Sequence, residues 1–196
     1  MILATSLCGN LAVQRRRGWR HAREKALAAS VLTSLATEIA GAAYHPAAQS
    51  PHSLAASPDL GMVSGRFDTL TFVIRCFPRN VEDCGGSMSC QVTPPDGLVF
   101  DLPSRTVTSR PGTTGPAASL DRAFGRPAAS SIAETARTPL LEAVRVCTAL
   151  TISPEAIVAQ TPAHVFAWPE DPDTIAAATW IGHLLTDLNN LPRRPR

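Results

Sequence analysis

The chain has 196 residues, a length that suits one domain with a sizeable core and leaves too little for two. Apolar residues make up 44% of it but aromatic residues only 5%, and 17 prolines imply that loops occupy much of the length. A net charge of +2 is too small to indicate the concentrated cationic face on which nucleic-acid binding depends, so no nucleic-acid partner is expected.

Positive charge gathers at the two ends of the chain. Residues 1–18 are apolar and then basic, and residues 192–196 form a basic tail, so we expect a single domain over 19–191. An apolar run followed by arginines and a tryptophan resembles the inner end of a membrane anchor, although the run is too short to cross a bilayer unaided. An ordinary helix start fits the same residues. The side chains that would touch a membrane are Arg15, Arg16, Arg17, Trp19 and Arg20.

The first predicted element is an amphipathic helix from Trp19 to Ala43. Apolar residues recur at every fourth position from Leu27 to Ile39, so burial is expected to begin near Leu27. The following segment, Tyr44 to Asp59, is rich in proline, serine and alanine and is predicted to be a loop. Its two histidines, His45 and His52, are expected to be solvated rather than to bind a metal.

The central part of the chain predicts short strands. Apolar and polar residues alternate from Leu70 to Phe77, and a turn before them suggests a hairpin with Met62 to Arg66. Further strands fit Ser87 to Thr93 and Leu98 to Leu102. Short strands joined by short turns favour an antiparallel sheet.

The C-terminal part predicts mainly helix after an irregular stretch from Pro103 to Pro127. Ser130 or Ser131 is expected to cap a helix with help from Glu134, and that helix should end near Arg137, with another starting at Pro139. A strand pair follows over 155–160 and 164–168, and the last helix covers about Pro172 to Leu191. The order of elements predicts an α+β fold, with a small antiparallel sheet of about four to six strands packed against an N-terminal and a C-terminal helix.

The cysteines do not form a pattern that predicts a metal site or a disulfide framework. Their number is odd, and the series Cys76, Cys84, Cys90 lacks the close pair that a zinc site uses. Cys76 and Cys147 are expected in the core, whereas Cys84 and Cys90 are expected to be exposed, where they could form a redox-sensitive pair. No motif for a serine nucleophile, a phosphate loop or a cofactor is present, so no cofactor is expected.

One stretch, from Thr114 to Phe124, combines a Gly-Pro break with an Asp-Arg pair. Gly115, Asp121, Arg122 and Phe124 are predicted to fix a loop, because aspartate at such a position accepts backbone N–H bonds and Phe124 can anchor the loop to the core. A catalytic role for Asp121 is the less favoured interpretation.

The motifs RRRGWR, IAGAAY, PPDGLVF and TGPAASLDRAF occur in an order that resembles a family of bacterial proteins without a known activity. Gly115, Asp121 and Phe124 match the loop of that family, whereas Pro116 and Leu120 depart from it. The resemblance covers about Arg15 to Leu191. It implies the fold described above and a setting close to a membrane, and it implies no reaction.

These observations lead to one main expectation and one alternative. The main expectation is a non-catalytic binding or scaffolding domain in the cytoplasm, or attached at the inner membrane face, that contacts another protein or anionic lipid. Its contact surface would be the apolar surface of the helices. The alternative is a small enzyme with a site assembled around Asp121, Arg122 and Cys84. The two are distinguished by whether Asp121 lines a deep pocket or lies beside a flat apolar patch.

Overall fold

The computed structural model describes residues 22, 25–46, 60–77, 87–108, 120–160 and 174–196. These residues confirm the predicted α+β class. The main sheet has seven antiparallel strands, more than the roughly four to six expected, and a second sheet has two. The additional strands are short and lie at the edges of the main sheet.

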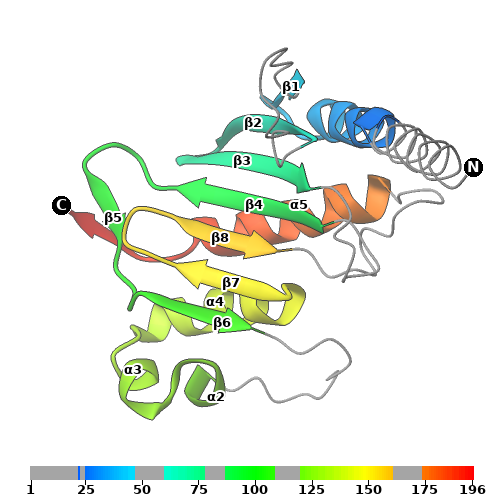
Figure 1. The fold of residues 1–196 in the computed structure, drawn as a ribbon. Coiled ribbons are helices and arrows are strands. Elements are labelled where there is room, and N and C mark those ends of the chain that lie inside the picture. Colours follow the sequence, from blue (N-terminus) through cyan, green and yellow to red (C-terminus); the bar gives the residue numbers. More distant parts are fainter. Residues whose placement is uncertain (1–21, 23–24, 47–59, 78–86, 109–119, 161–173) are drawn as a thin grey trace, which may run out of the picture.

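The main sheet runs without a break from one edge strand to the other (Figure 1). In spatial order its strands are β1 (Ala43–Pro46), β2 (Gly61–Phe67), β3 (Leu70–Phe77), β4 (Ser87–Thr93), β8 (Ile157–Gln160), β7 (Ala149–Ile152) and β6 (Arg105–Thr108). The predicted hairpin is confirmed, because β2 and β3 pair directly and Phe67 faces Leu70 next to the turn. The strand predicted over Ser87–Thr93 is confirmed as β4.

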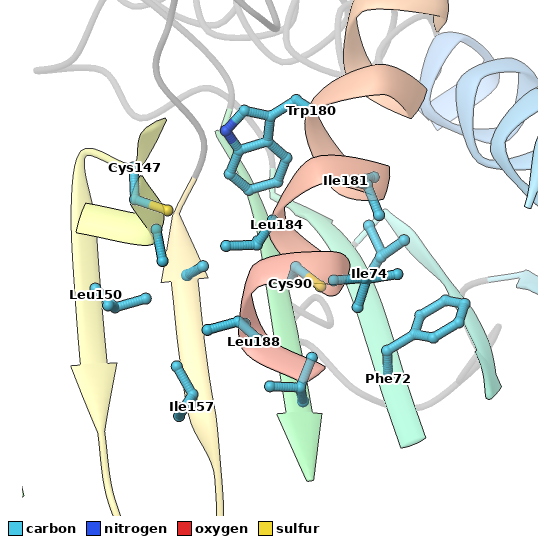
Figure 2. Close-up of a cluster of buried hydrophobic side chains, with 14 of the residues drawn as sticks. Phe72, Ile74, Cys90, Cys147, Leu150, Ile157, Trp180, Ile181, Leu184 and Leu188 are labelled. Carbon is cyan, nitrogen blue, oxygen red and sulfur yellow. The ribbon is translucent and has the colours of Figure 1, made fainter. Parts of the chain in front are cut away.

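One face of the main sheet is buried. On β3, Leu70, Phe72, Ile74 and Cys76 are fully buried, whereas the residues between them are exposed or half-buried. Because successive strand residues point to opposite faces, this alternation separates an inner face from an outer one. Inner-face residues of the neighbouring strands extend the core: Met88, Cys90, Val92, Leu150, Ile152, Ile157 and Ala159. Figure 2 labels Cys90, Leu150 and Ile157 among them.

Helices cover the inner face. The helices α4 (Glu134–Val146) and α5 (Thr174–Asn189) lie behind the sheet in Figure 1, and a helix over 25–38 joins the same apolar cluster. Four members of the expected apolar stripe of the last helix are fully buried, namely Ile181, Leu184, Leu185 and Leu188, and the side chain of the fifth, Ile175, lies outside the described part of the chain. Burial of each such side chain contributes about 1.5–3 kcal/mol, so this contact is a main source of stability.

The predicted break at Pro139 is wrong. Helix α4 continues from Glu134 to Val146 with Pro139 inside it. The missing N–H bond of an interior proline costs about 3 kcal/mol. Burial of an apolar stripe on both sides of the proline offsets this cost: Ala136, Leu140, Ala143 and Val144.

The predicted serine cap of that helix is also wrong. The residue before α4 is Ala133, which makes no side-chain capping bond. Ser130 ends the short helix α3 (Arg126–Ser130), and the Ser131 hydroxyl donates to the Ala128 carbonyl at 2.8 Å. The serines therefore finish one helix rather than begin the next.

Several segments differ from their predicted state because tertiary pairing decides it. Ala43–Pro46, predicted as helix end and loop, is β1, and the stretch predicted as irregular contains β6, α2 (Leu120–Phe124) and α3. The strand β8 pairs with β4 and β7, whereas its expected partner over 164–168 lies outside the described residues.

The basic tail is part of the fold. The strand β5 (Leu98–Phe100) was predicted within the main sheet, but it forms the second sheet with β9 (Arg193–Pro195). Arg193 holds this tail in place: its guanidinium donates to the Thr69 hydroxyl and, at 2.5 Å, to the Asn189 carbonyl. Asn189 in turn donates to the Asp68 carboxylate at 2.8 Å. This Arg193 network ties the tail to the end of α5 and to the β2–β3 turn.

Candidate functional site

The stretch singled out in the sequence is a short helix in its last part. Leu120–Phe124 forms α2, where Phe124 is 1% exposed and belongs to the core. The side chain of Asp121 is exposed, and its backbone carbonyl accepts the N–H of Gly125 at 2.8 Å. Gly115 and the side chain of Arg122 lie outside the described residues.

The residues expected to contact a membrane are not placed by the structure. Arg15, Arg16, Arg17, Trp19 and Arg20 all lie outside the described residues. Within the described ranges, every helix is too short or too polar to cross a bilayer.

The three thiols that the structure describes are buried, and burial disfavours their reactive thiolate form. Cys76 and Cys147 lie in the core as expected, but Cys90, expected at the surface, is also fully buried on the inner face of β4. Burial raises the pKa of Cys76 and of Cys90 from 9.0 to about 12. The expected redox pair is therefore wrong for Cys90, while Cys84 lies outside the described residues. No group of described side chains has the composition of a metal site.

In the described part of the chain, the apolar stripes of the helices face the core, whereas apolar helix surface was expected from the sequence to contact a partner. Their apolar stripes pack against the inner face of the sheet, with Leu35, Leu140 and Leu184 each fully buried. In the part of the chain that the structure describes, no helix or strand packs on the outer face, which is turned toward the viewer in Figure 1. The outer face is therefore the main candidate for contact with a partner.

We call this surface the open face and define it by the residues that alternate with the core on each strand. It is mainly polar and, among these residues, contains arginine but no acidic side chain. Its exposed and half-buried members are Ala43, His45, Met62, Ser64, Arg66, Thr71, Val73, Arg75, Phe77, Gln91, Thr93, Thr106, Thr108, Ala149, Thr151, Val158 and Gln160. Ser89 of β4 alternates with the same residues but is buried.

The arginines of the open face are not used in described ion pairs. The pairs between described residues join Arg137 to Glu134, Arg145 to Glu142 and Arg194 to Asp101. Arg66 is exposed and Arg75 half-buried, and neither takes part in these pairs. The positive charges of Arg66 and Arg75 are therefore not neutralised by an ion pair with a described side chain.

Strand register brings Ser64 between these two arginines. Arg66 lies two residues along β2 from Ser64 on the same face. Arg75 pairs with Met62, which lies two residues from Ser64 in the other direction. Neighbours of this kind are about 7 Å apart, a distance that a long arginine side chain spans. On the remaining side, His45 Nε2 lies 2.8 Å from Ser64 Oγ. We call His45, Ser64, Arg66 and Arg75 the Ser64 cluster.

The hydrogen bond between His45 and Ser64 raises the question of acyl transfer. A histidine within hydrogen-bond distance of a serine is the start of a nucleophile and base pair. Such a pair also requires a group that orients the histidine and donors that stabilise an oxyanion. Among the described residues, the hydrogen bond of His45 is to Ser64, and no acidic side chain is bonded to it. The described residues thus provide the Ser64 hydroxyl with an arginine on either side of it along the strand direction, Arg66 and Arg75.

Only part of this cluster can be predicted from the sequence. Alternation in β2 places Ser64 and Arg66 on one face, which could have been read from the sequence. His45 could not be included, because its segment was predicted as a loop and its pairing with β2 depends on contacts distant in sequence. Comparison with known proteins adds no relative: no family model, no curated protein and no solved structure matches this chain.

Proposed function

We propose that this chain is a non-catalytic binding or scaffolding domain that works near the inner membrane face and holds an acidic segment of a partner protein on its open face. The observation that supports the proposal is a sheet face on which no described helix or strand packs, which contains Arg66 and Arg75 and no acidic side chain among its described residues. Such a distribution attracts negative charge and disfavours cationic partners.

The side chains of the open face favour a polypeptide over a nucleic acid. Sheet faces that bind single-stranded RNA or DNA present aromatic side chains on which bases stack. Phe77 is the only aromatic residue among the described members of the open face. Threonine, serine and glutamine supply donors and acceptors that suit a peptide backbone, and arginine pairs with carboxylates in bidentate geometry.

The membrane setting depends on the N-terminal segment of the sequence. The arginines at 15–17 and Trp19 have the composition of a cytoplasmic membrane flank. A domain held near the membrane by this segment would leave its open face available to a protein partner. The two contacts involve different residues and can be tested separately.

The test uses the full chain and poly-L-glutamate as the probe for an acidic segment, measured by fluorescence anisotropy at low and moderate salt. The double substitution Arg66→Gln and Arg75→Gln is expected to weaken binding about tenfold, which corresponds to about 1.4 kcal/mol. The matched control is Arg105→Gln, which removes an exposed arginine at the end of β6 that is not part of the open face. Equal affinity of the double variant and the control variant would contradict the proposal.

A second arm tests the membrane setting. Substitution of Arg15, Arg16 and Arg17 by Gln is expected to abolish flotation of the chain with phosphatidylserine vesicles at low salt, because each such contact contributes about 1 kcal/mol. The same variant is expected to bind poly-L-glutamate through the open face. Flotation that depends on Arg66 and Arg75 instead would identify the open face as a lipid surface and would contradict the choice of a protein partner.

A further inference from the structure

The Ser64 cluster has the geometry of a position for one oxyanion. Ser64 lies midway between Arg66 and Arg75 along the sheet, as the register of β2 and β3 requires. A long side chain at either position can therefore reach an anion bound at the Ser64 hydroxyl. A guanidinium donates paired N–H bonds to a carboxylate or phosphate, and such charge-assisted bonds are stronger than neutral ones.

His45 controls what the Ser64 hydroxyl can do. The contact of 2.8 Å between His45 Nε2 and Ser64 Oγ has one of two directions, depending on the tautomer. When Nε2 carries the proton, His45 donates to Ser64 Oγ, and the hydroxyl proton of Ser64 is free to be donated to a ligand. His45 then acts as a positioning residue that turns the hydroxyl outward.

We infer that Ser64, Arg66 and Arg75 form a binding position for a single carboxylate or phosphate group, with His45 orienting the serine hydroxyl. This inference rests on the proposed function, since the oxyanion would belong to the acidic partner segment. According to this inference, one acidic group of the segment binds at Ser64, Arg66 and Arg75, whereas the rest of the open face contacts the segment less specifically. The ligand is exposed to water on one side, so we expect a dissociation constant on the order of millimolar for a free anion.

The test is a titration of the isotopically labelled full chain with sodium phosphate, followed by nuclear magnetic resonance. A second titration with sodium acetate separates phosphate from carboxylate recognition, and a third with sodium chloride controls for ionic strength. Saturable shifts are expected at the amides of Ser64 and of its cross-strand partner Val73. Phosphate binding with no response to acetate would identify a phosphorylated segment as the ligand, and a response to both would identify a general oxyanion site.

Variants separate binding by the serine from effects on folding. Ser64→Ala is expected to weaken anion binding about three- to tenfold, because it removes one neutral donor of a charge-assisted set. Thr108→Val removes a hydroxyl from β6 at the far edge of the same face and is expected to leave binding unchanged. His45→Gln, which keeps an N–H donor, is expected to retain binding, whereas His45→Ala is expected to weaken binding by no more than Ser64→Ala does. Unfolding curves of all variants show whether each one is folded.

The outcomes distinguish this inference from the proposed function. If Ser64→Ala binds phosphate and acetate like the unsubstituted chain, or if the shifts map elsewhere, the oxyanion position is wrong. Poly-L-glutamate binding that still depends on Arg66 and Arg75 would in that case leave the proposed function intact. If neither the anions nor poly-L-glutamate depend on these arginines, both are wrong.

Discussion

The indole nitrogen of Trp180 donates a hydrogen bond of 2.6 Å to the backbone carbonyl of Val146, the last residue of α4. The last carbonyls of a helix have no partner within it, so the side chain from α5 satisfies a group that would otherwise be unpaired. Trp180 is 7% exposed and lies beside the core in Figure 2. One residue thus joins both helices that cover the inner face.

Replacing Trp180 by Phe keeps an aromatic ring but removes this donor. The free energy of unfolding is expected to fall by about 1–3 kcal/mol, because a mostly buried carbonyl loses its partner. Urea unfolding followed by circular dichroism measures this change. A loss below about 0.5 kcal/mol would show that water replaces the indole and that the bond does not stabilise the α4–α5 contact.

Gly65 is a position on β2 where no side chain fits. A Cβ atom there would lie 2.8 Å from Phe72 Cζ and 2.9 Å from the carbonyl oxygen of Gly41. Gly65→Ala is therefore expected to destabilise the chain by about 1–3 kcal/mol.

Gly182 in α5 provides the matched control for that substitution. A Cβ atom there meets nothing within 4 Å, and its backbone is helical. Gly182→Ala is expected to stabilise the chain by about 0.5–1 kcal/mol, since alanine favours helix. Thermal unfolding of the two variants should shift in opposite directions, and a shift in the same direction would contradict the packing around Gly65.

The buried thiols predict a loss of stability at alkaline pH. Burial raises the pKa of Cys76 and of Cys90 to about 12, and burial, with smaller contributions from nearby Cys90 and Asp187, also raises the pKa of Cys147. Because the folded-state pKa lies above the unfolded value of 9.0, the stability from the neutral thiols is complete below pH 9 and is lost as the pH rises toward 12.

The expected slope is about 1.4 kcal/mol per pH unit for each thiol above pH 9. Few other groups interfere, because the chain has a single tyrosine and a single lysine. Urea unfolding at pH 8 and pH 10 measures the slope. Cys90→Ala should reduce it by the contribution of one thiol, about 1.4 kcal/mol per pH unit. Rapid carbamidomethylation of Cys76 or Cys90 by iodoacetamide in the native chain at pH 8 would contradict the burial.

The pairing of the C-terminal strand β9 with β5 is expected to depend on the side chain of Arg193. Arg193→Lys keeps the charge but cannot donate to both Thr69 and Asn189, so β9 should separate from β5 more often. The expected loss of stability is about 1–2 kcal/mol. Hydrogen exchange of Val99 and its neighbours in β5, measured by mass spectrometry, should become faster.

Arg194→Lys is the control on the same strand. Arg194 pairs with Asp101 at 3.2 Å at the surface, and exposed pairs contribute at most about 1 kcal/mol. Its exchange rates should match those of the unsubstituted chain. Equal acceleration in both variants would attribute the effect to the strand rather than to the network.

The sequence predicted what local patterns encode. Alternation around Phe72 and the helical spacing around Leu184 identified the central hairpin and the last helix, because each pattern reports the face that the core buries. Pro139 was misjudged because a local rule for proline was outweighed by burial of the stripe around Leu140. Short edge strands such as β1 and β6 escaped prediction because partners distant in sequence define them.

The candidate site could be predicted only in part for a similar reason. Arg66 and Ser64 share a face by simple alternation, but the approach of Arg75 depends on the register of a hairpin and that of His45 on an edge strand. A one-residue slip would move each of these side chains to the opposite face. Residue types alone therefore suggested Asp121 and the thiols as candidate site residues. The Ser64 cluster can be identified only when the register of the sheet is known.

Chemical modification of arginine side chains tests most directly whether the open face is the binding surface. The full chain is treated with phenylglyoxal with and without poly-L-glutamate, and modification of each arginine is followed by mass spectrometry. We predict that the polymer slows modification of Arg66 and Arg75 and leaves Arg105 unchanged. Protection confined to arginines outside the open face, with Arg66 and Arg75 modified at the same rate in both samples, would contradict it.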